Sequence, residues 1–333
     1  MPSPRHALAA PLVAQPRKTV DRDAFAPESH SMDPPPSSDL ETEPTRDLWR
    51  ACELAEEDPS AALDRAVAAL ARGAVVDAPR RRGLTPLVEA CMAGHGAIVA
   101  ALLEAGASTA VSDSALFPLL AAARAQSPGA LGALLAAGAD PNARKASGQS
   151  ALHEAASMGS PEHLRLLIDA GAQVDARDDS GQTPLMRACR FGELNNVLAL
   201  LDAGANPRAR DASGDEPIHC AAQAGSASRA RALVARGADI DAKGAELRTP
   251  LMLCARARAP GAAIELARLG ASISPLDASG LGAIDSARAL DLPELEGFLL
   301  DAELSREEAR ELAEETSAGS GNPGAPPPAA RRL

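Results

Sequence analysis

Cysteine and histidine are the side chains in this sequence whose chemistry best suits metal binding or nucleophilic catalysis. His219 directly precedes Cys220, and His153 occupies the corresponding position earlier in the chain. A metal site needs several such ligands converging at close spacing, and the sequence offers no such set. Cys91 and Cys189 share one position of a repeated segment but lie three segments apart, which is too far for a disulfide. We predict that both are buried as small apolar side chains.

Paired carboxylates offer a second route to chemistry. Asp178 and Asp179 are adjacent, but they fall in a predicted hairpin turn in solvent, where burial cannot tune a carboxyl pKa. The sequence also has no glycine-rich phosphate loop, no His-Glu-x-x-His motif and no nucleophile elbow. We therefore predict no enzymatic activity, no cofactor and no metal. A hydrolytic or metal-dependent enzyme stays as an alternative, in which His219 or Cys220 would be required for activity but not for folding.

The composition describes a protein built from small residues. Of 333 residues, 46% are hydrophobic, yet four phenylalanines, one tryptophan and no tyrosine exclude a large aromatic core. No apolar run approaches the roughly 18 residues that a membrane-spanning helix needs. The net charge of −12 is uneven, because residues 277–316 hold 12 acidic and 3 basic side chains while residues 79–276 are nearly neutral. An acidic chain argues against binding to nucleic acid or to anionic membranes.

The dipeptide Gly-Ala marks a regular repeat. Seven of its occurrences follow one another at intervals of 33 residues, with a single interval of 32. A fixed period of this length is typical of stacked helical arrays, in which small residues let neighbouring helices approach closely. The glycines of the seven dipeptides are Gly73, Gly106, Gly138, Gly171, Gly204, Gly237 and Gly270.

Each repeat has the same internal order. A turn glycine precedes Thr-Pro-Leu or a variant, as at residues 183–185, where threonine would cap a helix and proline would begin it. This first helix is short and rich in alanine, and it is broken by a second glycine such as Gly192. A second helix carries an apolar pattern and ends at Gly-Ala, whose glycine can adopt the left-handed conformation without strain. The following segment crosses to the next turn as one strand of a hairpin.

This pattern resembles the ankyrin repeat family, which has a 33-residue period and a Thr-Pro-Leu-His-x-Ala signature. His153 with Ala155 and His219 with Ala221 match the later part of that signature. The resemblance implies an all-α solenoid of stacked helix-turn-helix units with short β-hairpin turns, in which these histidines hydrogen-bond the turn. It covers residues 46–302, which we divide into an N-terminal cap at 46–78, six repeats at 79–275 and a degenerate C-terminal cap at 276–302.

The two ends of the chain differ from the array. Residues 1–45 and 317–333 are rich in proline, and we predict that they are disordered because they cannot bury enough apolar surface. Ser305 and Glu308 fit a capping box, which predicts a separate acidic helix at 303–316 that covers the end of the stack.

The start of the chain bears on where the protein acts. Either Met1 or Met32 could be the true start. Ala7–Ala14 is too short and too interrupted for a signal peptide, so we expect a cytoplasmic protein. The alternative is a bacterial effector that residues 1–45 direct into a host cell, where the array would bind a host protein. The excess of Arg over Lys, together with abundant Ala, Gly and Pro, is typical of a GC-rich genome, as in many bacteria.

The resemblance also implies a binding face. In ankyrin-like stacks, the hairpin tips and the ends of the first helices line a concave groove where ligands bind. The groove of this chain would carry a basic stripe with an apolar centre. From the helix ends we expect Met92, Arg124, Met158, Arg190, Phe191, Gln223 and Arg256. From the hairpins we expect Arg144, Arg177, Arg210 and Lys243.

Exposed arginine beside phenylalanine and methionine is typical of protein interaction hot spots. We therefore predict a monomeric, scaffold-like protein that binds another protein with an acidic or mixed-charge surface. In a competing interpretation, Arg177 and Arg210 merely pair with the aspartates beside them.

Two repeats depart from the pattern. In the second, Phe117 stands where threonine belongs, and it either fills a distorted turn or forms an apolar contact point. In the sixth, Gly244 begins an unusual turn and Arg258 replaces the glycine between the helices. The groove is expected to be irregular at both places.

Overall fold

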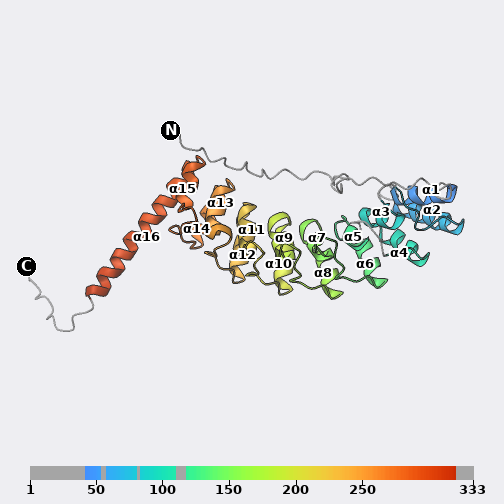
Figure 1. Ribbon diagram of the computed structural model, residues 1–333, viewed down its shortest axis with the longest axis horizontal. Coiled ribbons are helices and arrows are strands. Elements are labelled where there is room, and N and C mark those ends of the chain that lie inside the picture. Colours follow the sequence, from blue (N-terminus) through green and yellow to red (C-terminus); the bar gives the residue numbers. More distant parts are fainter. Residues whose placement is uncertain (1–41, 54–57, 81–82, 110–117, 320–333) are drawn as a thin grey trace, which may run out of the picture.

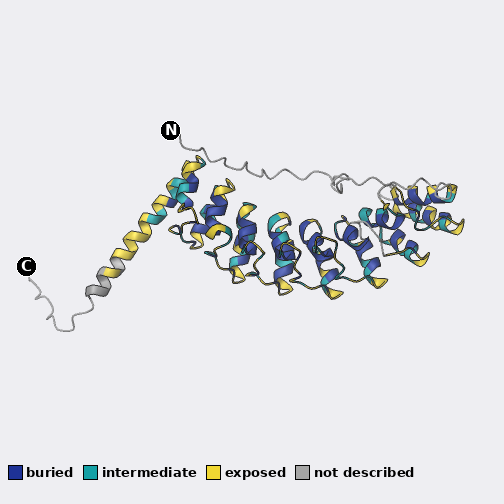
Figure 2. Ribbon diagram, viewed as in Figure 1, coloured by how far each residue is buried: buried dark blue, intermediate teal, exposed yellow. Residues whose placement is uncertain are grey.

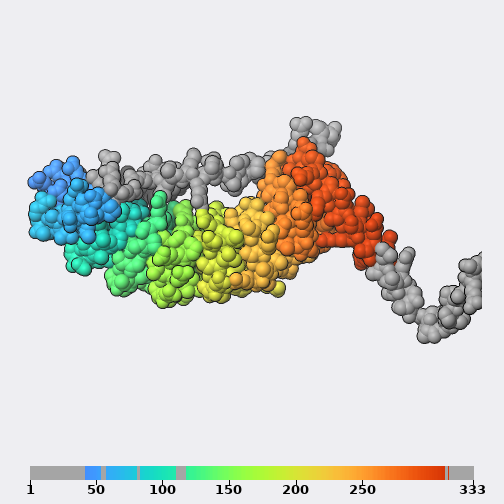
Figure 3. All heavy atoms as spheres, turned by 180° about the vertical axis from the view of Figure 1, so that it is seen from behind, coloured from blue at the N-terminus to red at the C-terminus, as the bar shows by residue number. Residues whose placement is uncertain are grey.

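The protein is a row of helix pairs stacked side by side (Figure 1). The computed structural model describes residues 42–53, 58–80, 83–109 and 118–319, and eight pairs lie within them. The row bends, and the first helix of each pair lies on the inner side of the bend (Figure 1). The view from behind shows successive units in continuous contact (Figure 3).

The first helices are short, whereas the second helices include one that is far longer than the others. The first helices are α1 (Glu43–Glu53), α3 (Pro86–Ala93), α5 (Pro118–Ala123), α7 (Ala151–Met158), α9 (Pro184–Phe191), α11 (Pro217–Gln223), α13 (Pro250–Arg256) and α15 (Ala283–Ala289). The second helices are α2 (Pro59–Ala71), α4 (Gly96–Glu104), α6 (Gly129–Ala136), α8 (Pro161–Asp169), α10 (Leu194–Asp202), α12 (Ala227–Ala235), α14 (Pro260–Arg268) and α16 (Pro293–Gly319).

The predicted hairpins are tight turns rather than strands. Each of the regular ones is closed by a backbone hydrogen bond across four residues, as from the Asp178 amide to the Gln182 carbonyl at 3.0 Å. Within the described residues, β pairing is confined to one isolated antiparallel bridge between Arg144 and Ser150. The helical architecture predicted from the sequence is confirmed.

Capping residues explain where the first helices begin. The hydroxyl groups of Thr85 and Thr183 each accept a hydrogen bond of 3.4 Å from the amide three residues later, as predicted. Thr249 also holds the cap position, but its hydroxyl makes no cap hydrogen bond. At α7 and α11 the cap is completed by histidine, because His153 and His219 accept from the amides of Ser150 and Glu216.

The repeated Gly-Ala dipeptides end the second helices as predicted. All seven glycines have positive φ, from +86° at Gly73 to +102° at Gly270, a conformation that favours glycine. The alanine that follows donates back to the carbonyl five residues earlier, as from Ala172 to Leu167 at 2.9 Å. This is the left-handed termination that satisfies the last helical carbonyls and turns the chain toward the next unit.

The core lies between the two rows of helices and runs the length of the array (Figure 2). Alanines of the first helices, such as Ala155 and Ala188, are fully buried, so adjacent units can pack closely. Leucines of the second helices, such as Leu164, Leu167 and Leu200, fill the space between the layers.

Polar side chains tie neighbouring units together inside this core. Asn196 of α10 is buried and donates to the Gly159 carbonyl at 2.9 Å, beyond the end of α7. Arg229, which is 33 residues later on α12, donates to the Cys189 carbonyl of α9 at 2.5 Å. The second helix of one unit therefore caps the carbonyl end of the first helix of the preceding unit.

The C-terminal helix departs from the prediction. α16 runs without a break from Pro293 to Gly319, so no boundary separates a cap at 276–302 from a helix at 303–316. The Ser305 hydroxyl donates to the Asp301 carbonyl at 2.9 Å, as in a helix interior, instead of capping a new helix. α16 also leaves the end of the stack instead of covering it (Figure 1).

Several expectations fall outside the described residues. They concern residues 1–41, with the choice between Met1 and Met32, the tail from residue 320 onward, and Phe117 in the second repeat. Among the helices that the structure does describe, none is both long enough and apolar enough to span a membrane.

Candidate binding face

The residues predicted to line the groove come from the ends of the first helices and from the turns before them, and they differ in how far they reach solvent. Met158 and Phe191 are 60% and 57% exposed, and they lie at the ends of α7 and α9 in adjacent units. Ser157, beside Met158, is buried. Also exposed are Arg144, Arg177, Arg210, Gln223, Lys243 and Arg256, whereas Met92, Arg124 and Arg190 are half-buried. We use the term inner face for this set of side chains.

Close backbone packing fixes the two apolar side chains at the surface. Gly159 and Gly192 follow them, and a Cβ atom at Gly159 would lie 2.9 Å from the Ala123 carbonyl of the preceding unit. Because these helices end against the neighbouring backbone, Met158 and Phe191 project from the array rather than into it. Exposing two large apolar side chains at neighbouring positions is typical of an interaction site.

Arg187 is part of this centre, although sequence reasoning missed it. Its guanidinium group lies 5.0 Å from the centre of the Phe191 ring, and its Nε atom donates to the Ser157 hydroxyl at 3.1 Å. Partial burial, together with the charges of Arg190 and Arg124, lowers the pKa of Arg187. The four-residue spacing of Arg187 and Phe191 on one helix was the available signal.

Arg190 is held by the next unit instead of being free for a partner. Its Nη2 atom donates to the Gln223 side-chain oxygen at 2.8 Å and approaches the Cys220 sulfur at 3.6 Å. A partner that used Arg190 would have to displace Gln223. We therefore regard Arg190 as a side chain that shapes the inner face next to Phe191.

A buried carboxylate organises the basic side chains beside Met158. Glu154 of α7 is almost completely buried, and its two oxygens lie 2.8 Å from Lys145 and 3.6 Å from Arg124. Lys145 and Glu154 were not among the predicted residues, because the pair is formed only when the hairpin folds back over the helix. The charge of Glu154 is more than balanced by these two cations.

The turn arginines form a ladder along the array. Arg144 donates to the Arg177 carbonyl at 2.7 Å, and Arg177 donates to the Arg210 carbonyl at 2.5 Å. Arg210 ends the ladder by pairing with the buried Glu216 at 3.1 Å. The competing interpretation, in which Arg177 and Arg210 pair with the adjacent aspartates, is wrong. Asp178 instead accepts from the amides of its own turn.

The ladder leaves positive charge on the surface. Backbone carbonyls orient the guanidinium groups of Arg144 and Arg177 without neutralising them. Both side chains remain exposed.

The regular geometry stops at the sixth unit. The turn there is a short 3₁₀ helix, η3 (Ala245–Leu247), in which Glu246 and Leu247 have φ values of +55° and +59°. His219 consequently donates to the Ala242 carbonyl at 3.0 Å, whereas His153 donates to the later Gln182 carbonyl. Arg258, which replaces the inter-helix glycine, likewise adopts a positive φ of +55°. The expected irregularity in this unit is confirmed.

Histidine and cysteine have structural environments. The predicted hydrogen bond from histidine to the turn is present at His153 and His219. All five cysteines are free and buried. Burial raises the pKa of Cys220 to about 11 and that of Cys52 to about 12, which keeps both thiols protonated. Across the described residues, no cluster of histidine, cysteine and carboxylate side chains has the geometry to hold a metal ion.

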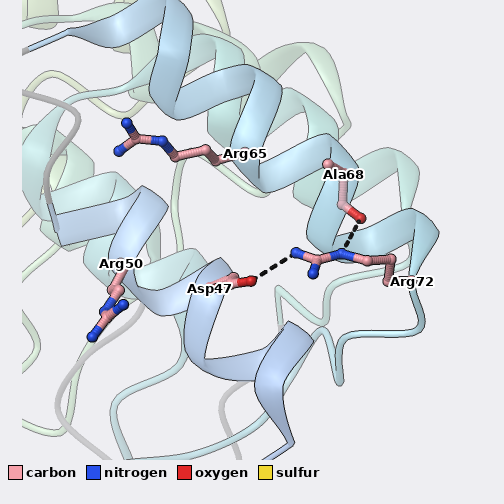
Figure 4. Close-up of a pocket in the computed structure, with 5 residues that line it drawn as sticks. All are labelled: Asp47, Arg50, Arg65, Ala68 and Arg72. Atoms are coloured by element: carbon pink, nitrogen blue, oxygen red, sulfur yellow. Dashed lines mark hydrogen bonds and ion pairs between the residues drawn. The ribbon is translucent and has the colours of Figure 1, made fainter.

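A separate depression lies between α1 and α2 in the N-terminal cap (Figure 4). Arg72 bridges the Asp47 carboxylate at 2.7 Å and the Ala68 carbonyl at 3.2 Å. Arg50 and Arg65 also line the depression, and they extend away from this bridge (Figure 4). It is an open surface feature at the other end of the array from α16.

The fold and the inner face together define a helical repeat solenoid with a surface suited to binding. Comparison with protein families identifies the repeat. A model described as "Ankyrin repeats (3 copies)" matches residues 119–211, and one described as "Ankyrin repeat" matches residues 82–114 and 213–245. The chain belongs to the ankyrin repeat family. A comparison with curated proteins finds no match.

Proposed function

We propose that the centre of the inner face binds a protein segment that presents an apolar side chain flanked by carboxylates. Ankyrin repeats are generally protein–protein interaction modules, and they are typically non-enzymatic. The observation that carries the finer proposal is the exposure of Met158 and Phe191 in adjacent units whose turn arginines, Arg144 and Arg177, have no carboxylate partner in the described structure.

The physical reasons for this choice are area and charge. Covering two exposed apolar side chains removes apolar surface from water. This burial contributes roughly 25 cal/mol of favourable free energy per Å². Arg144 and Arg177 are already oriented by carbonyls, so little conformational entropy remains to be lost when they meet a carboxylate. Arg187, which stacks on Phe191, adds a third positive charge at the apolar centre.

Selection from a displayed library of random peptides tests the proposal. The full chain is compared with a Met158→Ser/Phe191→Ser variant and with a Val67→Ser variant, which removes an exposed apolar side chain from α2. We expect peptides that combine leucine or an aromatic residue with aspartate or glutamate. They should bind the double variant at least about tenfold more weakly than the parent, since interface hot spots typically contribute more than that.

The Val67→Ser control should retain the same peptides with unchanged affinity, and all three proteins should have the same melting curve. Peptides without acidic residues, or peptides that bind the double variant as well as the parent, would show that the binding site lies elsewhere.

A further inference from the structure

The part of α16 from Leu300 onward, which we call the projecting half, is anchored to its own chain by Arg306 and is otherwise largely exposed up to Glu311. Leu295 and Leu299 are fully buried against the last unit, but the side chains of residues 304–311 are exposed. Figure 2 shows the helix becoming exposed where it leaves the array. Isolated helices of this length are only marginally stable in water, so a largely exposed projection of this kind is typical of a segment that packs against something else.

This projecting half has two exposed leucines on one side. Leu300 and Leu304 are 38% and 58% exposed and are separated by one helical turn. Carboxylates surround them, because Asp301, Glu307 and Glu308 lie within one or two turns. The segment is therefore an apolar pair within an acidic surface. Those are the features that the inner face is suited to bind.

α16 cannot place these leucines on the inner face of its own chain. Arg306 donates from Nη1 to the Ala271 carbonyl at 3.0 Å and from Nη2 to the Ala267 carbonyl at 3.5 Å, which fixes α16 to the end of α14. Beyond α14 the helix leaves the end of the row and extends away from the inner side of the bend (Figure 1). An inner face that receives α16 must belong to another copy.

We infer that the projecting half of α16 from one copy docks on the inner face of a second copy. Leu300 and Leu304 contact Met158 and Phe191, while Asp301, Glu307 and Glu308 face the turn arginines. This inference rests on the proposed function, for which it names an occupant, and it departs from the expectation of a monomer. The contact joins two different surfaces, so the copy that supplies the helix keeps a free inner face and the copy that supplies the inner face keeps a free helix.

The contact should be weak and sensitive to salt. One helical face of a few turns buries less area than stable interfaces do, and much of the attraction comes from exposed charges. A reversible association fits this chemistry better than a permanent complex.

Complementation between two variants of the full chain tests the inference by sedimentation velocity. The face variant is Met158→Ser/Phe191→Ser, and the helix variant is Leu300→Ser/Leu304→Ser. The parent is expected to form larger species as its concentration rises, with the effect at least tenfold weaker in 0.5 M than in 0.05 M NaCl. Each variant alone should stay monomeric. An equal mixture should form dimers that do not grow, because one intact surface of each kind remains.

Circular dichroism melting of each variant serves as the folding control, since all four substituted side chains are exposed. A parent that is monomeric at every concentration overturns the inference, as does association that persists in either variant or a mixture that fails to dimerise. If the parent stays monomeric while the peptide selection still depends on Met158 and Phe191, only the inference about α16 is lost. If neither assay depends on these residues, the proposed function is lost as well.

Discussion

The hairpins of the central units and the hairpin of the sixth unit occupy the same position in the repeat, but different residues adopt the positive φ that the turn requires. At Gly148, Gly181 and Gly214 a glycine adopts the left-handed conformation. In the sixth unit Glu246 and Leu247 adopt it instead, and Leu247 is left exposed.

This difference in the turns changes which hydrogen bonds can form between units. Between the central units, each arginine of the ladder reaches the carbonyl 33 residues later. Arg210, which would reach the sixth unit, pairs with Glu216 in its own unit instead. The repeat thus depends on turn geometry as much as on the packing of the helices. Substitutions in the regular array should therefore differ in effect from substitutions at this irregular end.

The largest effect is expected from a cavity in the regular array. Leu167→Ala should lower the free energy of unfolding by about 2–5 kcal/mol, because the side chain is fully buried and the backbone cannot close around the space. Urea unfolding followed by circular dichroism measures it. Leu276→Ala, at the exposed irregular end, should change stability by no more than about 0.5 kcal/mol. Equal losses would mean that the irregular end is packed as tightly as the centre.

The turns themselves should respond in opposite directions. Gly181→Ala should destabilise the protein by about 1–2 kcal/mol, because φ is +75° and the new Cβ would lie 2.9 Å from the Ala212 nitrogen. Leu247→Gly should leave stability unchanged or raise it by up to about 1 kcal/mol, since glycine relieves the positive φ. Chemical unfolding of both variants checks the pair. A destabilising Leu247→Gly would show that this leucine packs on the fold.

A smaller effect is expected from the ladder. Arg177→Gln removes a charged donor from the Arg210 carbonyl and should cost about 1 kcal/mol, reduced from the usual range because the side chain is exposed. Lys243→Gln, its counterpart two units later, should have an effect within about 0.5 kcal/mol. Differential scanning calorimetry resolves the two. If Lys243→Gln is the more damaging change, the ladder does not stabilise the central units.

The smallest effect on stability is expected at the proposed contact. Phe191→Ala should lower the free energy of unfolding by no more than about 1 kcal/mol, which is the range for an exposed interaction between arginine and an aromatic ring. Thermal unfolding of the variant and of the parent protein, measured side by side, checks this expectation. A drop of several kcal/mol would place Phe191 in the core and remove it from the inner face.

Local rules predicted the fold well because they act within one unit. The glycines of Gly-Ala adopt positive φ because no other residue does so without strain, and Thr85 and Thr183 cap helices through atoms three residues away. The same rule did not hold at Thr249, whose unit has the irregular turn. The Ser305 box matched the pattern of a helix start, but a continuous helix accommodates the same residues.

The binding side chains were only partly predictable, because their partners come from other units. Arg190 bonds to Gln223, and Asn196 bonds to Gly159, across separations of more than 30 residues. The resemblance to ankyrin repeats predicted that Phe191 and Met158 line the groove, and both side chains are exposed. It did not indicate that Glu154 would draw Lys145 and Arg124 together, since that depends on how a hairpin folds over a helix.

The arginine ladder has a consequence for how the chain can change length. Arg144 bonds to the carbonyl of residue 177, and Arg177 bonds in the same way to the carbonyl of residue 210. If residues 177–209 were excised as one block, Arg144 would meet the carbonyl of Arg210 in place of the one it lost. Duplication of the block would create a new donor and a new acceptor together. The array can therefore gain or lose whole 33-residue modules without losing a hydrogen bond of the ladder, while a deletion of another length misaligns the hydrogen bond that spans it.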